Sequence, residues 1–325
     1  MGKDRAKAEE AKRLTYGPVP SRRLGFSLGV DIIPYKTCSY NCIYCQLGKT
    51  TNKTLRRKSY VNPATVLKEI KKAISENKKI DYITFSGSGE PTLNKDLGLL
   101  IEKTKKITSI PVAVLTNGSL LWRKSVREDL VSADLVVPSL DAVSAQVFRK
   151  INRPAKGLNV KEISDGIKKF AEDFKGEIRL EIMLVKDVND SKKEIKKINE
   201  FVKDLKIDKI ELNTAIRPPN DPQARPLTKG ELLKIKSLFD PDLKVEIIPD
   251  FSKHYEEKVF RKDLEQRIID LLKRRPCRKE EMAISLGVHL NELLKYLNLL
   301  LHRKKIKKSE KSSQKDYYII NLIET

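Results

Sequence analysis

Short apolar runs alternate with longer amphipathic segments between about residues 28 and 250 of this chain. The runs are rich in β-branched residues, as buried strands are, and the longer segments repeat apolar residues at helical spacing. In segment 63–76, Val66 and Ile70 share one face, Asn62 supplies an N-cap and Pro63 opens the first turn. Strands are expected at 28–33, 82–86, 112–115, 135–137, 177–185, 209–213 and 244–248.

The repeated strand–helix order predicts an α/β fold in which helices cover a mostly parallel sheet. Active sites of such sheets lie at the carboxyl ends of the strands. Polar segments follow four successive predicted strands: a group of cysteines, residues 87–90, Asn117, and the pair Ser139 and Asp141. We therefore expect a partial or complete (β/α) barrel whose functional residues gather on one rim.

The pattern changes near residue 260. Helices are predicted at 264–272, 278–286 and 289–302, followed by the basic run 303–308 and a strand-like segment at 316–320. Three helices and a basic hairpin are typical of a winged helix-turn-helix. The predicted domains are a barrel over residues 1–255 and a small winged helix-turn-helix domain over residues 256–325.

Three of the four cysteines, Cys38, Cys42 and Cys45, lie within eight residues of one another. Three thiolates can hold three irons of a [4Fe–4S] cluster and leave the fourth iron open to a substrate or cofactor. A structural zinc site is the alternative, but zinc takes four ligands, and Cys277 and the three histidines are distant in sequence. A disulfide framework fits an odd triplet poorly.

The spacing C-x3-C-x2-C, with the aromatic Tyr44 before the last cysteine, resembles the signature of the radical S-adenosylmethionine (SAM) superfamily. The resemblance implies an enzyme with a partial (β/α)6 barrel, one [4Fe–4S] cluster and SAM as cofactors, and Cys38, Cys42 and Cys45 as metal ligands and catalytic residues. One electron from the cluster would cleave SAM to methionine and a 5′-deoxyadenosyl radical. The protein would orient the reactants and exclude competing reactions.

The same resemblance assigns SAM-binding roles to the predicted rim. The adenine would meet Tyr44, and the methionyl ammonium would meet residues 87–90, with Glu90 as its partner or orienter. This stretch resembles a Gly-Gly-Glu-Pro motif of the family, but Ser88 replaces its first glycine. The expected SAM-binding residues are Tyr44, Gly87, Ser88, Gly89, Glu90, Asn117, Ser139, Asp141 and Asn213.

Two of these residues have specific expected partners. Asp141 would accept hydrogen bonds from the ribose hydroxyls, and Ser139 would donate to the SAM carboxylate. Structural roles remain as alternatives for two of the expected SAM-binding residues. Asp141 can cap the helix that follows it, and Asn117 can form an ordinary turn with Gly118. Glu181, on the fifth predicted strand, is a further polar candidate.

The substrate is expected between the two ends of the barrel sequence. Arg22 and Arg23 follow the run Tyr16-Gly-Pro-Val-Pro-Ser21, and Arg217 follows the sixth strand. These arginines are the candidate substrate ligands because a guanidinium can hold a carboxylate or phosphate with two hydrogen bonds. With the cysteine run, both segments resemble a wyosine-synthase-like group of the superfamily.

The net charge of +22 is unevenly distributed. Residues 1–72 carry 16 Lys and Arg against 5 Asp and Glu, and residues 267–325 carry 14 against 7. Such a field favours a polyanion or an acidic protein. We therefore expect RNA, tRNA in particular, as the substrate, with the basic loop 49–58 as a contact. An acidic electron donor such as flavodoxin or ferredoxin is the other expected partner.

Two other functions compete with RNA modification. The same chemistry could act on a protein or small molecule, including glycyl-radical activation, or the chain could be an iron–sulfur-sensing transcription factor. A sensor has no need of a SAM-binding rim, and segment 289–302 is mostly apolar, unlike a helix that reads bases. No apolar run approaches the roughly 20 residues that span a bilayer, so no membrane partner and a cytoplasmic location are expected.

Overall fold

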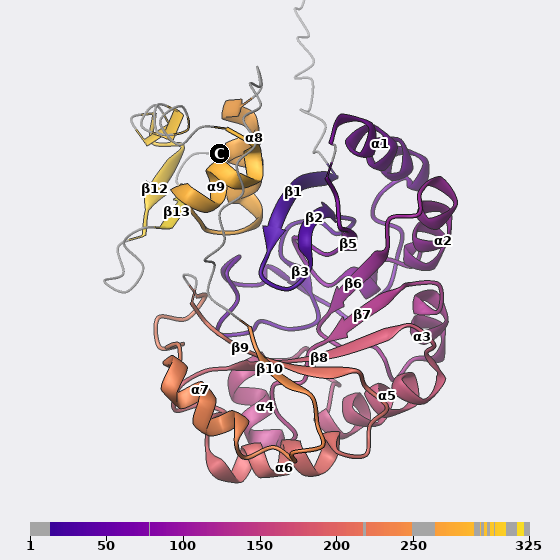
Figure 1. Ribbon diagram of the computed structural model, residues 1–325, viewed down its shortest axis with the longest axis vertical. Helices are drawn as coiled ribbons and strands as arrows, with labels where there is room; N and C mark the ends of the chain where they lie inside the picture. Colours follow the sequence, from indigo (N-terminus) through magenta and orange to yellow (C-terminus); the bar gives the residue numbers. More distant parts are fainter. Residues whose placement is uncertain are drawn as a thin grey trace, which may run out of the picture.

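The computed structural model describes residues 14–77, 79–216, 219–248, 264–288, 293, 296–297, 300–301, 303–309 and 317–321. Its main sheet has the strand order β1-β2-β5-β6-β7-β8-β9-β10 (Figure 1). The bounds are β1 Thr15–Ser21, β2 Gly25–Val30, β5 Tyr82–Phe85, β6 Val112–Thr116, β7 Leu135–Pro138, β8 Glu177–Leu184, β9 Lys209–Thr214 and β10 Val245–Ile247.

All neighbouring strands from β2 to β10 are parallel, whereas β1 runs antiparallel to β2. The seven strands expected from the sequence are confirmed, although the first begins at Gly25 and ends at Val30. The expected six-stranded barrel is corrected in one respect: the sheet has eight strands in the part of the chain that the structure describes. The order has no pairing between β1 and β10, so the sheet is an open one.

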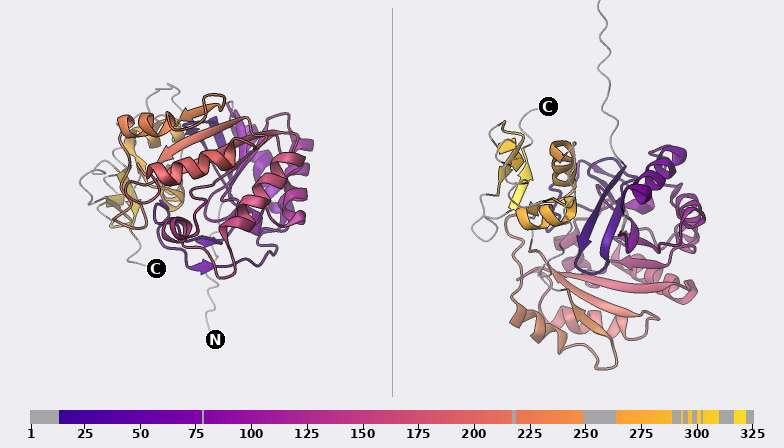
Figure 2. Two further views of the ribbon diagram at one scale, coloured as in Figure 1. Left: turned by 90° about the horizontal axis from the view of Figure 1, so that it is seen from below. Right: turned by 45° about the horizontal axis from the view of Figure 1, so that its top comes forward.

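Helices follow most of the parallel strands and form an arc around the outer side of the sheet (Figures 1 and 2). The predicted helix at 63–76 is confirmed, and the Asn62 side chain accepts from the Ala64 N–H. Among the described residues no helix is both long and apolar enough to cross a membrane. The helices are α1 Pro63–Glu76, α2 Leu97–Ile107, α3 Lys124–Leu130, α4 Ala145–Asn152, α5 Val160–Asp173, α6 Lys192–Val202 and α7 Lys229–Lys236.

Alternate residues along each strand face opposite sides of the sheet, and the two sides differ. The outward residues, such as Phe85, Val114 and Ile182, pack with the helices in the main hydrophobic core. Inward residues include Ser27 and Glu181, which line a cavity on the opposite side. The sheet therefore has one apolar face for stability and one partly polar face for a ligand.

The cysteine segment lies between β2 and α1. It contains β3 Thr37–Cys38 and β4 Asn52–Lys53, which pair in parallel with each other. The Thr37 carbonyl accepts from Glu90 N at 3.1 Å, and the Lys36 N–H donates to Ser88 O at 2.7 Å. A Cβ on Gly89 would meet Thr37 O at 1.9 Å, so this glycine allows two protein loops to approach.

Among its described residues, the C-terminal module contains two continuous helices, further helical residues at 293, 296–297 and 300–301, and a small antiparallel sheet of order β11-β13-β12. Gly287 ends the second helix with a left-handed φ of 64°, as the sequence predicts. Most of the predicted helix at 289–302 and the segment at 249–263 lie outside the described residues. The elements are α8 Leu264–Arg274, β11 Cys277–Arg278, α9 Lys279–Leu286, β12 Ile306–Lys308 and β13 Tyr317–Ile320.

The module packs against β1 of the main sheet (Figure 1 and the right view of Figure 2). Tyr16 of β1 contacts the module's hydrophobic core, which contains Leu264, Ile268, Cys277 and Leu293. The Cys277 side chain is fully buried there. This contact brings the end of α8 to the edge of the main cavity.

Candidate functional site: a cysteine-lined cavity

A cavity of about 400 Å³ lies at the carboxyl ends of the parallel strands. Polar segments that follow β2, β5, β6 and β7 converge there, as the strand order predicts. The residues predicted to bind cluster, SAM or substrate that line it are Arg22, Arg23, Cys38, Cys42, Tyr44, Cys45, Gly87, Ser88, Gly89, Glu90, Asn117, Ser139 and Asn213. Asp141 is absent from this lining, and Arg217 lies outside the described residues.

Each of the three cysteine sulfurs accepts a hydrogen bond from a side-chain nitrogen. The Lys36 ammonium lies 3.3 Å from Cys45 Sγ. Asn117 Nδ2 donates to Cys38 Sγ at 3.4 Å, and Asn152 Nδ2 donates to Cys42 Sγ at 3.5 Å. Such donors stabilise thiolates and orient ligands around a metal centre. No role was assigned to Lys36 or Asn152 from the sequence, because their hydrogen bonds to the sulfurs depend on the folded arrangement.

The cysteines suit a cluster better than a single ion. Among the described residues, no three His, Cys, Asp or Glu side chains form a group that could hold one metal ion. A cubane distributes its three thiolates over three irons and does not need them to converge on one point. Burial raises the pKa of Cys38 to about 12 and also raises that of Cys42. Cation binding must therefore displace thiol protons.

Glu90 is buried and serves the protein's own loops. Its Oε1 accepts from Thr92 N at 3.1 Å, Thr92 Oγ1 at 2.7 Å and Thr116 Oγ1 at 2.6 Å. Its Oε2 accepts from Asn117 N at 2.8 Å, and the residue lines the cavity. Burial raises the pKa of Glu90, although these hydrogen bonds oppose the shift. Glu90 thus holds the Asn117 turn in place.

Asp141 corrects one sequence prediction. Its carboxylate does not line the cavity, because it accepts from Tyr44 OH at 2.5 Å, Asn152 Nδ2 at 2.7 Å and Met183 N at 2.9 Å. Nor does it cap the next helix, whose N-cap residue is Ser144. Burial raises the pKa of Asp141 to about 6. Asp141 therefore orients Tyr44, which precedes Cys45, and Asn152, which donates to Cys42 Sγ.

The serine that replaces a glycine in the family motif has a structural partner. Ser88 Oγ donates to Asp31 Oδ2 at 2.5 Å, and Ser88 N donates to Asp31 Oδ1 at 3.1 Å. Asp31 also lies 3.9 Å from Arg274 Nε of the C-terminal module. The Ser88 hydroxyl thus connects the loop after β5 to the module through Asp31.

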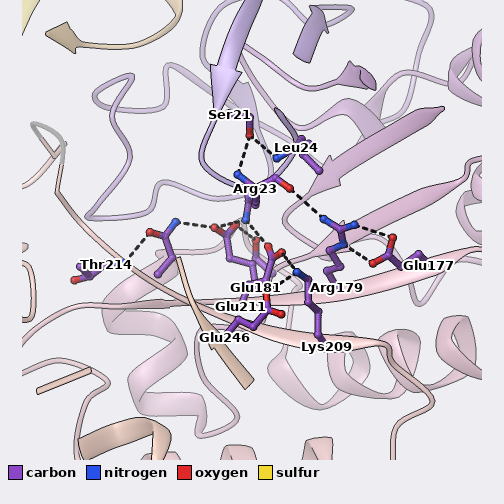
Figure 3. A network of polar contacts seen from close by, with 12 residues as sticks. Ser21, Arg23, Leu24, Glu177, Arg179, Glu181, Lys209, Glu211, Thr214 and Glu246 are labelled. Atoms are coloured by element: carbon purple, nitrogen blue, oxygen red, sulfur yellow. Dashed lines mark hydrogen bonds and ion pairs between the residues drawn. The ribbon is translucent and has the colours of Figure 1, made fainter. Parts of the chain in front are cut away.

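Arg23 crosses the cavity side of the sheet to a group of acids (Figure 3). Its Nη1 lies 2.7 Å from Glu181 Oε1 and 3.1 Å from Glu211 Oε2. Asn213 Nδ2 also donates to Glu181 Oε1, at 2.8 Å. Burial acts to raise the pKa of Glu181, but Arg23 and Asn213 outweigh it and the pKa is lowered. The predicted substrate ligand Arg23 is therefore an internal counterion, and no sequence motif marks its partner Glu211.

The basic loop 49–58 divides into structural and exposed residues. Arg57 donates to Thr92 O at 2.8 Å and forms an ion pair with Asp129. Lys49, Arg56 and Lys58 are exposed. Arg57 therefore anchors the loop to the barrel, and the exposed residues are the ones available to a partner.

A known family and several known proteins match much of this chain. Residues 32–201 match the family model described as the Radical SAM superfamily. A UPF0026 protein of Methanocaldococcus jannaschii is 38% identical over 82% of this chain and 84% of its own length. A protein named GTPase Obg, from Brachyspira hyodysenteriae, is 42% identical over 91% of this chain, but the chain spans 44% of that protein.

A solved structure shares the fold. The structure of TYW1 with a lysine-pyruvate adduct bound has a TM-score of 0.50 with this chain. The match covers 69% of this chain and 75% of the TYW1 chain, at 20% sequence identity.

Proposed function

Because the chain belongs to the radical SAM superfamily, whose members are enzymes that use SAM and a [4Fe–4S] cluster, we propose that Cys38, Cys42 and Cys45 hold the cluster and that RNA is the substrate. One observation carries the cluster assignment: each of the three sulfurs lines the cavity and accepts an N–H hydrogen bond. When bound and reduced, the cluster supplies the electron that cleaves SAM to methionine and a 5′-deoxyadenosyl radical.

The chain's own residues position the reactants. Lys36, Asn117 and Asn152 stabilise the sulfurs as thiolates. On the opposite wall, Glu181 accepts from Ser139 Oγ at 3.4 Å and from Asn213 Nδ2 at 2.8 Å. We assign SAM to the space between these walls, with Ser139 and Asn213 as direct ligands. Tyr44 also faces SAM, and Asp141 fixes its hydroxyl.

The charge distribution supports RNA as the substrate, with tRNA as the first candidate. Residues 1–72 and 267–325 contain 30 of the 66 Lys and Arg residues. The exposed Lys49, Arg56 and Lys58 follow Cys45 closely in the sequence, so a polyanion bound to them would lie near the cysteines. A winged helix formed by the C-terminal module would extend this surface.

The test of the function is anaerobic reconstitution with SAM, dithionite and total RNA, followed by mass analysis of the nucleosides. We expect 5′-deoxyadenosine and a nucleoside of changed mass, both dependent on the enzyme. Cleavage of SAM with unchanged nucleosides in every RNA fraction would contradict the RNA substrate and favour a protein or small molecule.

A triple variant that removes three positive charges tests whether RNA or an acidic electron donor binds the basic loop. Replacing Lys49, Arg56 and Lys58 by Gln should flatten the log–log salt dependence of RNA binding, by about 0.7–0.9 for each phosphate that the loop no longer neutralises. The matched control replaces the exposed Lys161, Lys168 and Lys169 of α5. If the first variant slows turnover with flavodoxin but not with dithionite, this surface binds the reductant instead.

A further inference from the structure

The C-terminal module places two buried arginines, Arg274 and Arg275, in the main cavity. Arg275 directly follows α8, is 8% exposed and lines the cavity with Tyr16 and Ser86 of the barrel domain. Arg275 Nε and Nη2 are buried and have no hydrogen-bond partner among the residues that the structure describes. Unmet hydrogen-bond donors on a buried charged group are energetically costly. Such a group is therefore expected to have a ligand.

Its sequence neighbour has different surroundings. Arg274 pairs with Asp31, lies with its guanidinium carbon 4.7 Å from the Tyr16 ring centre, and donates to Asp270 O at 3.0 Å. These contacts fix the end of α8 on β1. Burial acts to lower the pKa of Arg275, but the nearby Cys277 and Glu281 outweigh it and the pKa is raised. The Glu281 carboxylate itself accepts from Arg278 N at 3.3 Å. Arg274 thus anchors the module, which leaves Arg275 held at the cavity.

The two unpartnered nitrogens of Arg275 form one edge of the guanidinium. In the same protein, Arg179 uses this edge on a carboxylate: Nε donates to Glu177 Oε1 at 2.6 Å and Nη2 to Glu177 Oε2 at 2.8 Å (Figure 3). Two parallel donors match two oxygens of a phosphate or carboxylate. The edge that Glu177 occupies on Arg179 is therefore the edge that Arg275 offers to a ligand.

We propose that Arg275 binds a phosphate group of the substrate through Nε and Nη2, so that the C-terminal module completes the substrate site. The inference rests on the proposed function, because it assigns Arg275 to the substrate and not to SAM. The phosphate can be a phosphodiester of RNA or the monophosphate of a free nucleotide. In either case the barrel domain without the module lacks this contact.

The test is calorimetric binding to the cluster-loaded full chain in the presence of SAM. The probes are total tRNA, uridine 5′-monophosphate and, as a non-phosphate anion, acetate. Arg275→Gln should weaken binding of at least one phosphate probe tenfold or more, and Arg275→Lys should weaken it less. Lys273→Gln removes one positive charge from the exposed side of α8 and should bind as the parent does.

Each outcome separates this inference from the proposed function. If the parent and Arg275→Gln bind both phosphate probes equally, the Arg275 site is wrong whatever the substrate is. If the monophosphate binds through Arg275 but tRNA does not bind, the site holds and the RNA substrate fails. Loss of SAM affinity in Arg275→Gln would move Arg275 to the SAM site and overturn the inference. If Arg275→Gln does not fold, Arg275→Lys decides: parental affinity for both phosphate probes would overturn the two-donor contact.

Discussion

The buried carboxylates on the two sides of the cavity have different kinds of partner. On the cysteine side, Glu90 and Asp141 accept hydrogen bonds from hydroxyl, amide and backbone donors, and burial raises the pKa of both. On the far side, Glu181 and Glu211 are paired with Arg23, and the pKa of Glu181 is lowered. Among the described residues, neither Glu90, which lines the cavity, nor Asp141 behind it forms an ion pair, whereas Arg23 pairs with both Glu181 and Glu211.

This difference suits a cationic ligand. SAM carries a sulfonium and an ammonium, so in the proposed placement the wall of Glu90 would gain a counterion on SAM binding. The wall around Arg23 already has a cation paired with its acids, so its charged groups stabilise the fold, and only neutral groups such as Ser139 and Asn213 are available there to SAM. The cavity therefore has a ligand-responsive wall and a structural wall.

The largest expected effect is at the ligand-responsive wall. Cys38→Ala, Cys42→Ala and Cys45→Ala should each abolish the cluster and SAM cleavage, because no other described side chain replaces the missing thiolate. Iron and sulfide content after anaerobic reconstitution, with 5′-deoxyadenosine formation, measures both. Cys277→Ala is the matched control, since its thiol is buried in the module, and it should retain the cluster. Full cluster loading in any of the first three variants would contradict the assignment.

At the structural wall, Arg23→Met should lower the free energy of unfolding by about 3–5 kcal/mol, because Glu181 loses its counterion and Glu211 keeps only Lys209, at 3.5 Å. Urea unfolding of the apo-protein measures this loss. Arg225→Met is the control, because its ion pair with Asp187 is exposed and should contribute little. Equal losses in the two variants would show that the far wall does not depend on its central cation.

The sequence was sufficient for most of the sheet and for the placing of the rim. The spacing of apolar residues identifies the buried parallel strands. Because all strands of repeated βα units run in one direction, their carboxyl ends meet at the same edge of the sheet for any loop conformation. It was not sufficient for β1, where Gly17, Pro18 and Pro20 interrupt any strand pattern; prolines are tolerated there because β1 is an edge strand. From the sequence, the segment from Tyr16 to Arg23 was expected to face the substrate, and the pairing of β1 with β2 was not predicted.

Side-chain direction and distant partners were the other limits. Ser139 and Asp141 are two residues apart, yet Ser139 lines the cavity and Asp141 turns behind it to Tyr44. Arg23 looked like a substrate ligand because its acid, Glu211, is 188 positions away. Arg275 had no motif, and its interest depends on how the module packs on β1. Pairings across such distances are set by tertiary packing, which local patterns do not encode.

The smallest effect concerns the pH dependence of the ligand-responsive wall. The pKa of Asp141 is about 6 in the folded protein against an ordinary value of 3.8. The folded state then binds more protons than the unfolded state between these pH values, so stability falls as pH rises through this window. Asp141→Asn removes the ionisation. Its free energy of unfolding relative to the parent should therefore improve by up to about 3 kcal/mol from pH 4 to pH 7 in the apo-protein.

Asn at position 141 retains an acceptor for Met183 N, and the Tyr44 hydroxyl can turn to accept from its amide. The amide cannot accept from Asn152 Nδ2, which costs stability equally at every pH and leaves the pH dependence of the difference unchanged. Anaerobic urea unfolding at several pH values gives the difference, and Asp187→Asn, which removes an exposed carboxylate, should keep the parent's pH dependence. A pH-independent difference between Asp141→Asn and the parent would mean that Asp141 is already ionised without cost. The contrast between the two walls would then rest on Glu90 alone.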